Sequence, residues 1–302
     1  MSQYKIEFRH FSPLYWGVWL LLGLGWCVAQ LPFSTQLALG KGLGRLIQFI
    51  SPSRRRITRR NIELCFPELT TQERRQFINE SFVSLGMGFV EIALAYWGSS
   101  DRLAPLCHIK GLDKLEQLRQ EGKGVMIMAA HMTSLELCLR LFSETYPVAA
   151  MYKPAHNDLF EIYSYQKRAR FLTPIPNKKL RTFLQHLKKG GAAFYLPDQH
   201  YGVNHSIFAP FFGIQTSTIA HTPDFVKLTH SAVTPVLFGR EADGYHIEIM
   251  PALEFPTDDP VKAATLINYW IKQNIRKYPG QYLWQHRRFK HRPEGESPIY
   301  EK

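Results

Sequence analysis

Cysteine is scarce in this chain of 302 residues, and its placement excludes two kinds of small domain. The cysteines stand far apart, and no two of them form a CxxC pair or a cluster with metal-ligand spacing. We therefore expect neither a disulfide framework nor a structural zinc site. The pattern favours a reducing compartment. The four residues are Cys27, Cys65, Cys107 and Cys138.

Three catalytic motifs are also missing. The chain has no GxSxG, no GxxxxGK(S/T), and no GxGxxG set between a strand and a helix. Their absence excludes a serine hydrolase with a nucleophile elbow, a P-loop enzyme and a dinucleotide-binding enzyme. Any catalysis must come from other side chains.

Charged residues are absent from the 21-residue stretch 11–31. As a helix it would measure about 31 Å at ~1.5 Å per residue, enough to cross a hydrocarbon core of ~30 Å. We predict an uncleaved membrane anchor within residues 1–35, followed by a catalytic domain over residues 36–302. The alternative is a hydrophobic helix that packs on the domain or lies in the headgroup plane. Aromatic residues suited to the membrane interface are Tyr15, Trp16, Trp19 and Trp26.

Acidic residues are absent between Lys41 and Arg60, where seven basic residues gather, and the whole chain carries a formal charge of +12. Such an excess indicates an anionic partner: nucleic acid, an acidic protein, a phosphorylated substrate or an anionic membrane. Because the basic cluster follows the apolar stretch, the positive-inside rule places the catalytic domain on the cytoplasmic side. The cluster comprises Lys41, Arg45, Arg54, Arg55, Arg56, Arg59 and Arg60.

Apolar runs alternate with helical patterns over the rest of the chain, which predicts an α/β fold with a mixed sheet flanked by helices. Thr70, with Glu73 three residues later, marks the start of the longest helix. Residues 54–61 are typical of a basic helix or a loop. We predict strands at 124–130, 147–152, 192–196, 232–238 and 245–250, and helices at 34–50, 70–97, 112–121, 133–145, 158–172, 179–189, 216–230 and 260–277.

The strand at 124–130 ends in His131, and Glu136 follows five positions later. Open α/β sheets bind ligands at the carboxyl ends of their strands. A histidine there, oriented by a carboxylate, can take a proton from a substrate hydroxyl near neutral pH. The alternative is a capping box, with Thr133 as N-cap and Glu136 bonded back to it. In that case His131 is a core histidine.

Other strand ends and helices add further candidates. Asp198 follows the strand at 192–196, where it could orient His131, bind an arginine or cap a turn. Arg168 and Arg170 lie about 200° apart on one helix, so only one of them can face a given site. Cys138 fits a core residue better than a nucleophile. Residues 210–213 suit a lipid-binding cleft or the core.

Several segments, in order, resemble the late acyltransferases of lipid A biosynthesis, in particular those that transfer lauroyl groups. The resemblance covers nearly the whole chain. It rests on the amino-terminal apolar stretch, residues 59–68, His131 with its acid, 151–154 with Asn157, Arg168 with Arg170, 197–202, 210–212 and 281–290.

The resemblance implies the glycerolipid-acyltransferase fold and transfer from acyl carrier protein to a hydroxyl of a 3-hydroxyacyl chain on a Kdo-bearing lipid A precursor. The donor thioester arrives as substrate, so no cofactor and no metal are implied. His131 would be the general base and Glu136 its orienting carboxylate, at a position where the lauroyltransferases usually carry aspartate. Arg168 or Arg170, with Asp198, would complete the catalytic site.

The same segments supply expected substrate-binding residues, and the resemblance implies a location at the inner membrane of a Gram-negative bacterium. The expected partners are acyl carrier protein, the phosphorylated glycolipid and the membrane, without nucleic acid. The substrate-binding candidates are Tyr152, Lys153, Asn157, Arg170, Gln199, Arg287 and Arg288.

Two alternatives stay open. One is an acyltransferase of the same fold that uses glycerol phosphate or a lysophospholipid as acceptor. The other is a membrane-anchored nucleic-acid-binding protein that uses the arginine cluster and the aromatic and basic residues of 281–290. The second alternative leaves His131 and Glu136 without a role.

Overall fold

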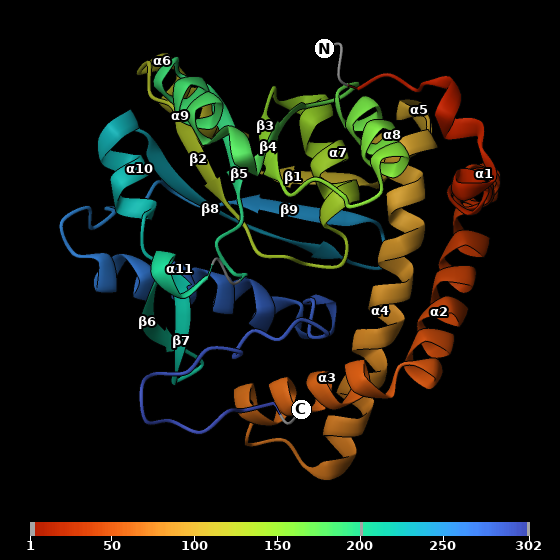
Figure 1. The fold of residues 1–302 in the computed structure, drawn as a ribbon. Helices are drawn as coiled ribbons and strands as arrows, with labels where there is room; N and C mark the ends of the chain where they lie inside the picture. The colour runs from red at the N-terminus through yellow and green to blue at the C-terminus, as the bar shows by residue number, and fades with distance from the viewer. Residues whose placement is uncertain (1–3, 200–201, 301–302) are drawn as a thin grey trace.

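A seven-stranded mixed sheet forms the centre of the fold (Figure 1). The computed structural model describes residues 4–199 and 202–300. The strand order is β1-β9-β8-β2-β5-β3-β4. The strands are β1 (Cys107–Lys110), β2 (Val125–Met128), β3 (Ala149–Tyr152), β4 (Thr173–Pro176), β5 (Ala192–Tyr195), β8 (Ala232–Arg240) and β9 (Tyr245–Ile249).

The central strands run parallel, and one antiparallel pair makes the sheet mixed. β2 pairs in parallel with β5 and β8, β3 pairs in parallel with β4 and β5, and β9 is antiparallel to β8. All four residues of β2 and of β5 are buried. Parallel strands covered on both faces consist of continuous apolar runs, which is the pattern that the sequence shows here. The predicted fold class is confirmed.

Helices flank the sheet in two groups (Figure 1). α7 and α8 both contact the long helix α4, whereas α9 contacts α10 and α11 contacts β8. Thr70 caps α4 in a capping box with Glu73, as predicted. The helices are α1 (Trp16–Gln30), α2 (Phe33–Ile50), α3 (Pro52–Cys65), α4 (Thr71–Trp97), α5 (Ser100–Leu103), α6 (Leu112–Gln120), α7 (Leu135–Thr145), α8 (Asp158–Arg168), α9 (Leu180–Lys188), α10 (Thr222–Thr229) and α11 (Pro260–Lys277).

All five predicted strands are present, but β1 and β4 were not predicted. β1 reads Cys-His-Ile-Lys and β4 reads Thr-Pro-Ile-Pro, so neither has the apolar run by which the equally short β2 and β5 were predicted. β4 also contains Pro174 and Pro176, which lack the backbone N–H that an interior strand needs. It lies at the edge of the sheet, where proline is tolerated.

The predicted helix at 216–230 is wrong over its first part. Residues 214–219 form β7 (Ile214–Ile219), which pairs antiparallel with β6 (Ser206–Phe211) in a separate hairpin packed on α11. Phe212 and Gly213 both have positive φ, the backbone that a tight hairpin turn requires. Within residues 210–213, the Phe211 side chain is fully buried and therefore belongs to the core.

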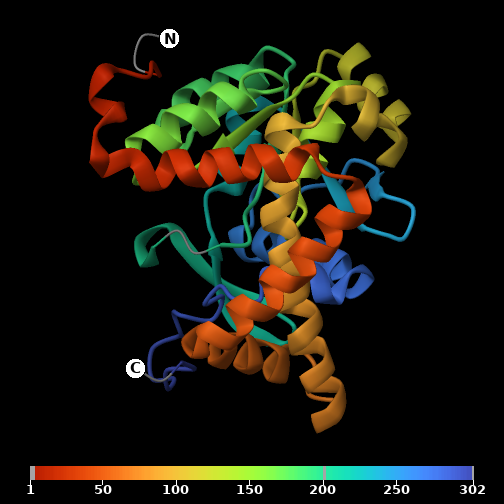
Figure 2. The same ribbon diagram turned by 90° about the vertical axis from the view of Figure 1, so that its right-hand side faces the viewer.

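The apolar stretch 11–31 forms a shorter helix than a membrane span requires. Only the 15 residues of α1 are α-helical, about 22 Å at ~1.5 Å per residue, because Pro13 and Pro32 bound the helix. Figure 2 shows α1 (red) and α2 (orange) on one face of the molecule, beside α4. α1 thus packs on the domain and leaves several large apolar side chains exposed, and the membrane anchor stays a prediction.

One helix in the described ranges, α4, is long and apolar enough to cross a membrane, but 61% of its most apolar window is buried in the protein. A mostly buried helix of this kind is typical of the core of a folded domain.

Glycines bring α2 and α4 into close contact. A Cβ added to Gly44 would fall against the backbone of Phe82 on α4, and one added to Gly86 would fall against the backbone of α2. Gly42, on the same helix as Gly44, would meet nothing within 4 Å. The absence of a side chain at Gly44 and Gly86 therefore sets the distance between the axes of α2 and α4.

We expect Gly44→Ala to destabilise the protein by about 1–3 kcal/mol, because the added methyl group forces the two backbones apart. Gly42→Ala is the matched control, and it should be neutral or stabilising by up to ~1 kcal/mol since alanine favours the helix. Urea unfolding of both variants measures the difference. Equal effects of the two substitutions would contradict the close contact.

Candidate active site

His131 and Asp198 meet at the carboxyl ends of two neighbouring parallel strands. β2 and β5 lie in register, with Met128 opposite Tyr195, and each of the two polar residues follows three positions beyond that pair. Equal offsets from paired positions bring the side chains to the same point on the sheet edge. The predicted proximity of the two strand ends is confirmed.

Asp198 orients His131 through two contacts. One carboxylate oxygen lies 2.5 Å from His131 Nδ1, and the other accepts the backbone N–H of His131 at 2.8 Å. Asp198 is fully buried, whereas the His131 side chain is 26% exposed. With Nδ1–H donated to the carboxylate, Nε2 carries the lone pair, and none of the described residues is hydrogen-bonded to it. The imidazole can therefore accept a proton at Nε2.

The surroundings keep Asp198 ionised. Burial alone would raise its pKa, but the charge and hydrogen bonds of His131, together with the charge of Arg288, hold the pKa of Asp198 below its ordinary value. The same carboxylate adds to the effect of burial in raising the pKa of Tyr282 well above the usual range. Asp198 is thus an anion that can stabilise an imidazolium.

Glu136 does not contact His131 as expected; its partner is Arg168. Both carboxylate oxygens accept hydrogen bonds from the guanidinium, at 2.7 and 2.8 Å. Because Glu136 lies in the first turn of α7, its side chain faces α8, which carries Arg168. The capping box is also not found: the N-cap is Ser134, and Thr133 is hydrogen-bonded to Ser84 at 2.7 Å.

The end of β3 adds a polar cluster beside this ion pair. The Tyr152 hydroxyl donates to Glu161 at 2.6 Å, and the guanidinium of Arg168 lies over the Tyr152 ring, 5.1 Å from its centroid. Asn157 caps α8 by accepting the N–H of Phe160. Their side chains therefore already have partners within the protein.

The remaining candidates divide into exposed and buried residues. Lys153, after β3, and Arg170, beyond α8, are exposed, while Gln199 is half-buried beside Asp198. His200 and Tyr201, part of the 197–202 segment, lie outside the described residues. Cys138 is fully buried, and burial raises its pKa, as a core residue requires.

Arg288 was expected to bind substrate, but the structure places it inside the protein. Its guanidinium donates to the Ser217 carbonyl at 2.6 Å and to Thr218 and Asn268 at 3.2 Å. Burial lowers its pKa. The neighbouring Arg287 is exposed instead, since adjacent residues of this segment point in different directions.

Arg287 lines a basic cavity of about 510 Å³ between α3 and the carboxyl-terminal segment. Three arginines of α3 share it: Arg56, Arg59 and Arg60. Glu63 is the acidic residue of the lining. A concave surface with this charge suits an anionic group.

The comparisons with known proteins decide the family. The sequence profile described as bacterial lipid A biosynthesis acyltransferase matches residues 1–291. The chain belongs to this family. It is 38% identical over 99% of its length to the lipid A biosynthesis palmitoleoyltransferase of Escherichia coli K12, covering 98% of that protein. It is 34% identical to the lauroyltransferase of the same strain, over 95% of this chain and 96% of the relative.

The family members differ in the acyl group that their names specify, and the similarity extends to a third one. The Escherichia coli lipid A biosynthesis myristoyltransferase is 26% identical over the full length of this chain and 95% of its own. The protein is therefore a bacterial lipid A acyltransferase by family.

A set of polar contacts that holds the His131 loop of this acyltransferase was not predicted from the sequence. Buried Glu91 on α4 binds Arg240 at 2.5 and 2.8 Å and accepts from the Tyr245 hydroxyl at 2.6 Å. Gln281 accepts the backbone N–H of Thr133 and also donates to Arg240. A glutamate inside a long apolar helix was the available signal, since a buried charge needs a partner.

The lowered pKa of Asp198 makes a prediction about stability. A carboxyl group with a lower pKa in the folded state stabilises the fold above its unfolded pKa, about 3.9, and this contribution disappears as the pH falls through the folded value. Urea unfolding of wild type and Asp198→Asn should thus differ most above about pH 5, with the gap shrinking towards pH ~3. Exposed Asp113→Asn should stay within about 0.5 kcal/mol of wild type throughout. A gap that widens on acidification would contradict the assignment.

Proposed function

We propose that the protein transfers a fatty acyl group from acyl carrier protein to a hydroxyl of a 3-hydroxyacyl chain on a Kdo-bearing lipid A precursor, with His131 as general base. The observation that carries the proposal is the pair of His131 and buried Asp198 at a strand end, with Nε2 of the imidazole left to accept a proton. Family membership supports the lipid A acceptor and the acyl transfer.

The proposed reaction moves one proton and exchanges one bond. Nε2 of His131 takes the proton of the acceptor hydroxyl as that oxygen attacks the thioester carbonyl carbon. The tetrahedral intermediate then collapses, the carbon–sulfur bond breaks, and the imidazolium returns its proton to the departing thiolate. Asp198 holds the ring and stabilises the imidazolium, as a buried carboxylate does for a catalytic histidine.

We assign Glu136 and Arg168 a positioning role. Their two-bond ion pair joins α7 to α8 beside the end of β3. Arg168 also covers the Tyr152 ring, so the pair keeps that wall of the site in place. Lys153, exposed after the end of β3, and Gln199, half-buried beside Asp198, follow strand ends and are proposed substrate-binding residues. Arg170, exposed beyond α8, is a further candidate.

Charge supports the choice of substrates. Both proposed partners, a phosphorylated glycolipid and an acidic carrier protein, are anionic. The basic cavity formed by α3 and Arg287 offers guanidinium groups, which bind phosphate and carboxylate through paired hydrogen bonds. We propose that this cavity receives an anionic group of one of the two substrates.

An exposed apolar surface supports association with a membrane at the cytoplasmic face of the inner membrane. α1 and α2 lie on one face of the molecule (Figure 2) and leave large apolar side chains in solvent. Contiguous apolar exposure of this kind is typical of a membrane or protein interface. The residues are Trp16, Leu20, Leu21, Leu24, Trp26, Leu39, Leu43, Leu46, Phe49 and Ile50.

Acyl transfer by the purified protein tests the reaction. Carrier protein loaded with lauroyl or palmitoleoyl groups is combined with the Kdo-bearing tetra-acylated precursor, and mass spectrometry follows the gain of one acyl group. His131→Ala should lower the rate by roughly 10²–10⁴, since it removes the general base. Asp198→Asn should fall in the same range, because the ring loses the carboxylate that orients it and stabilises its charge.

The variant Glu136→Gln distinguishes the role of Glu136 from that of Asp198. A positioning role predicts a smaller loss, mainly in KM, because the amide keeps part of the contact with Arg168. If Glu136→Gln lost as much activity as His131→Ala while Asp198→Asn stayed active, Glu136 and not Asp198 would be the carboxylate that acts with His131. Full activity of His131→Ala would overturn the proposed mechanism.

The basic cavity gives a separate kinetic prediction. Replacing Arg56 and Arg59 with Gln should raise KM for one substrate roughly 10-fold or more, since a hydrogen bond to a charged group is worth about 1.5–3 kcal/mol. The effect should shrink at high salt. Arg181→Gln is the matched control, because Arg181 is exposed on α9, away from the cavity. Unchanged KM values for both substrates would remove the cavity from the binding surface.

A further inference from the structure

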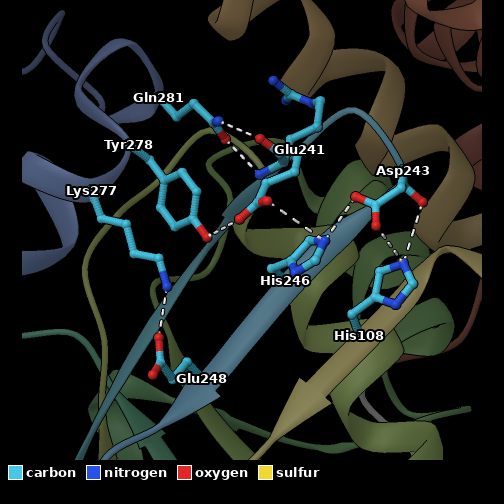
Figure 3. Close-up of polar contacts among 9 residues, drawn as sticks. His108, Glu241, Asp243, His246, Glu248, Lys277, Tyr278 and Gln281 are labelled. Carbon is cyan, nitrogen blue, oxygen red and sulfur yellow. Dashed lines mark hydrogen bonds and ion pairs between the residues drawn. The ribbon is translucent and has the colours of Figure 1, made fainter.

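Two histidines face each other across strands β1 and β9, away from the His131 site. His108 and His246 are partners in the parallel register, and their rings stack with centroids 4.6 Å apart (Figure 3). The His108 side chain is 39% exposed and that of His246 is 25% exposed. The proposed acyl transfer makes no use of either residue.

Asp243, in the turn between β8 and β9, contacts both imidazoles at one edge of the stacked rings (Figure 3). One of its carboxylate oxygens is 2.8 Å from His246 Nε2, and the other is 3.6 Å from His108 Nε2. Both imidazoles therefore turn the same nitrogen towards one carboxylate.

A second carboxylate completes the cluster. Glu241 has one oxygen 3.7 Å from His246 Nε2, while its other oxygen accepts the Tyr278 hydroxyl at 2.7 Å. The hydrogen bond from Tyr278 fixes the carboxylate from behind, as outer partners of metal ligands commonly do.

The backbone places this turn against β1. Gly244 has φ of 146°, and a Cβ there would fall on the carbonyl of Leu106, the residue before β1. The N–H of Glu241 also donates to the Gly244 carbonyl at 2.7 Å, which closes the turn. Asp243 is thereby held next to His108.

We infer that His108, Asp243 and His246 form a binding site for a divalent transition-metal ion of the zinc type, with Glu241 available as a fourth ligand. Two imidazole nitrogens with carboxylate oxygens are ligands that zinc accepts in tetrahedral sites, whereas calcium and magnesium prefer oxygen alone. In the structure His108 Nε2 faces the Asp243 carbonyl at 3.3 Å and His246 Nε2 faces its carboxylate at 2.8 Å, so each Nε2 carries a proton there. On metal binding each imidazole would carry its proton on Nδ1 instead and coordinate through the Nε2 lone pair.

The spacing of the ligand atoms fits with small side-chain movements. In the structure, the three ligand atoms of His108, Asp243 and His246 lie within 4.8 Å of one another. Bonds of ~2.0–2.2 Å in a tetrahedral site separate ligand atoms by roughly 3.4 Å. The pair of His246 Nε2 and Asp243, now 2.8 Å apart, would open slightly, and the widest pair would close by at most about 1.4 Å. The Asp243 side chain is 62% exposed and free to make that adjustment.

A metal at this site would tie the edge strand β1 to the β8–β9 turn. The predicted role is structural, because β8 and β9 separate β1 from the strand that leads to His131. Binding should stabilise the folded protein according to the metal concentration relative to its dissociation constant. The inference is independent of the proposed acyl transfer.

Metal binding to the full chain tests the inference. The protein is treated with EDTA, freed of chelator and titrated with Zn²⁺ by calorimetry, and with Co²⁺ followed by visible absorption. We expect one strong site, with an intense tetrahedral Co²⁺ spectrum and a rise in Tm with added Zn²⁺. His108→Asn and Asp243→Asn should each weaken binding at least 10–100-fold, the range that loss of an outer partner alone produces.

A matched variant guards against general binding to surface histidines. His221 is also exposed and bonded to a carboxylate, Asp224 at 3.0 Å, so His221→Asn should leave the strong site unchanged. Far-UV circular dichroism confirms that each variant is folded, and His108 lies on an edge strand where substitution is tolerated. The inference would be overturned if the wild-type protein did not bind the metal. It would also be overturned if His108→Asn and Asp243→Asn bound the metal as tightly as the wild-type protein.

Discussion

The contact between His131 and Asp198 is the interaction on which the proposed chemistry depends. An anion without solvent access is costly unless it has partners. Here the imidazole, the backbone N–H of His131 and the nearby charge of Arg288 supply them. The contacts that offset the cost of burying the carboxylate also fix the imidazole ring. One set of contacts therefore serves both the folded state and the proposed catalytic arrangement. Loss of either partner would leave the other wrongly placed.

Around that pair, the loop that carries His131 is held from two sides. Backbone hydrogen bonds join it to the segment that contains Gln281 and Leu283. Ser84 on α4 holds Thr133, and the buried ion pair of Glu91 with Arg240 fastens α4 to the end of β8. Preorganisation of this kind would keep the proposed general base in position without help from the substrate.

Local sequence patterns predicted the positions that follow from the order and pairing of strands. They did not predict the side-chain partners that depend on how helices and strands pack in three dimensions. Asp198 could be placed beside His131, because two parallel strand ends must meet at one edge. The partner of Glu136 depends on how α7 faces α8, which no spacing reveals. Arg288 was misplaced because its buried partners lie on β7, a strand that was taken for a helix. His108 and His246 are distant in sequence, and β1, which carries His108, has no apolar run from which a strand could be predicted.

Two close glycine contacts on α4 fix the distance between α2 and the His131 loop, which lie on different sides of this helix. Gly86 touches the backbone of α2 on one side, and Gly88 touches the backbone of Thr133, in the His131 loop, on another. A helix with its side chains is about 10–12 Å across, and glycine contacts bring its neighbours nearer still. In the proposed arrangement, with α2 on the lipid surface, His131 would lie at a fixed height above the bilayer. Because that height is fixed, the hydroxyl of the acceptor lipid would have to move out of the bilayer to reach His131.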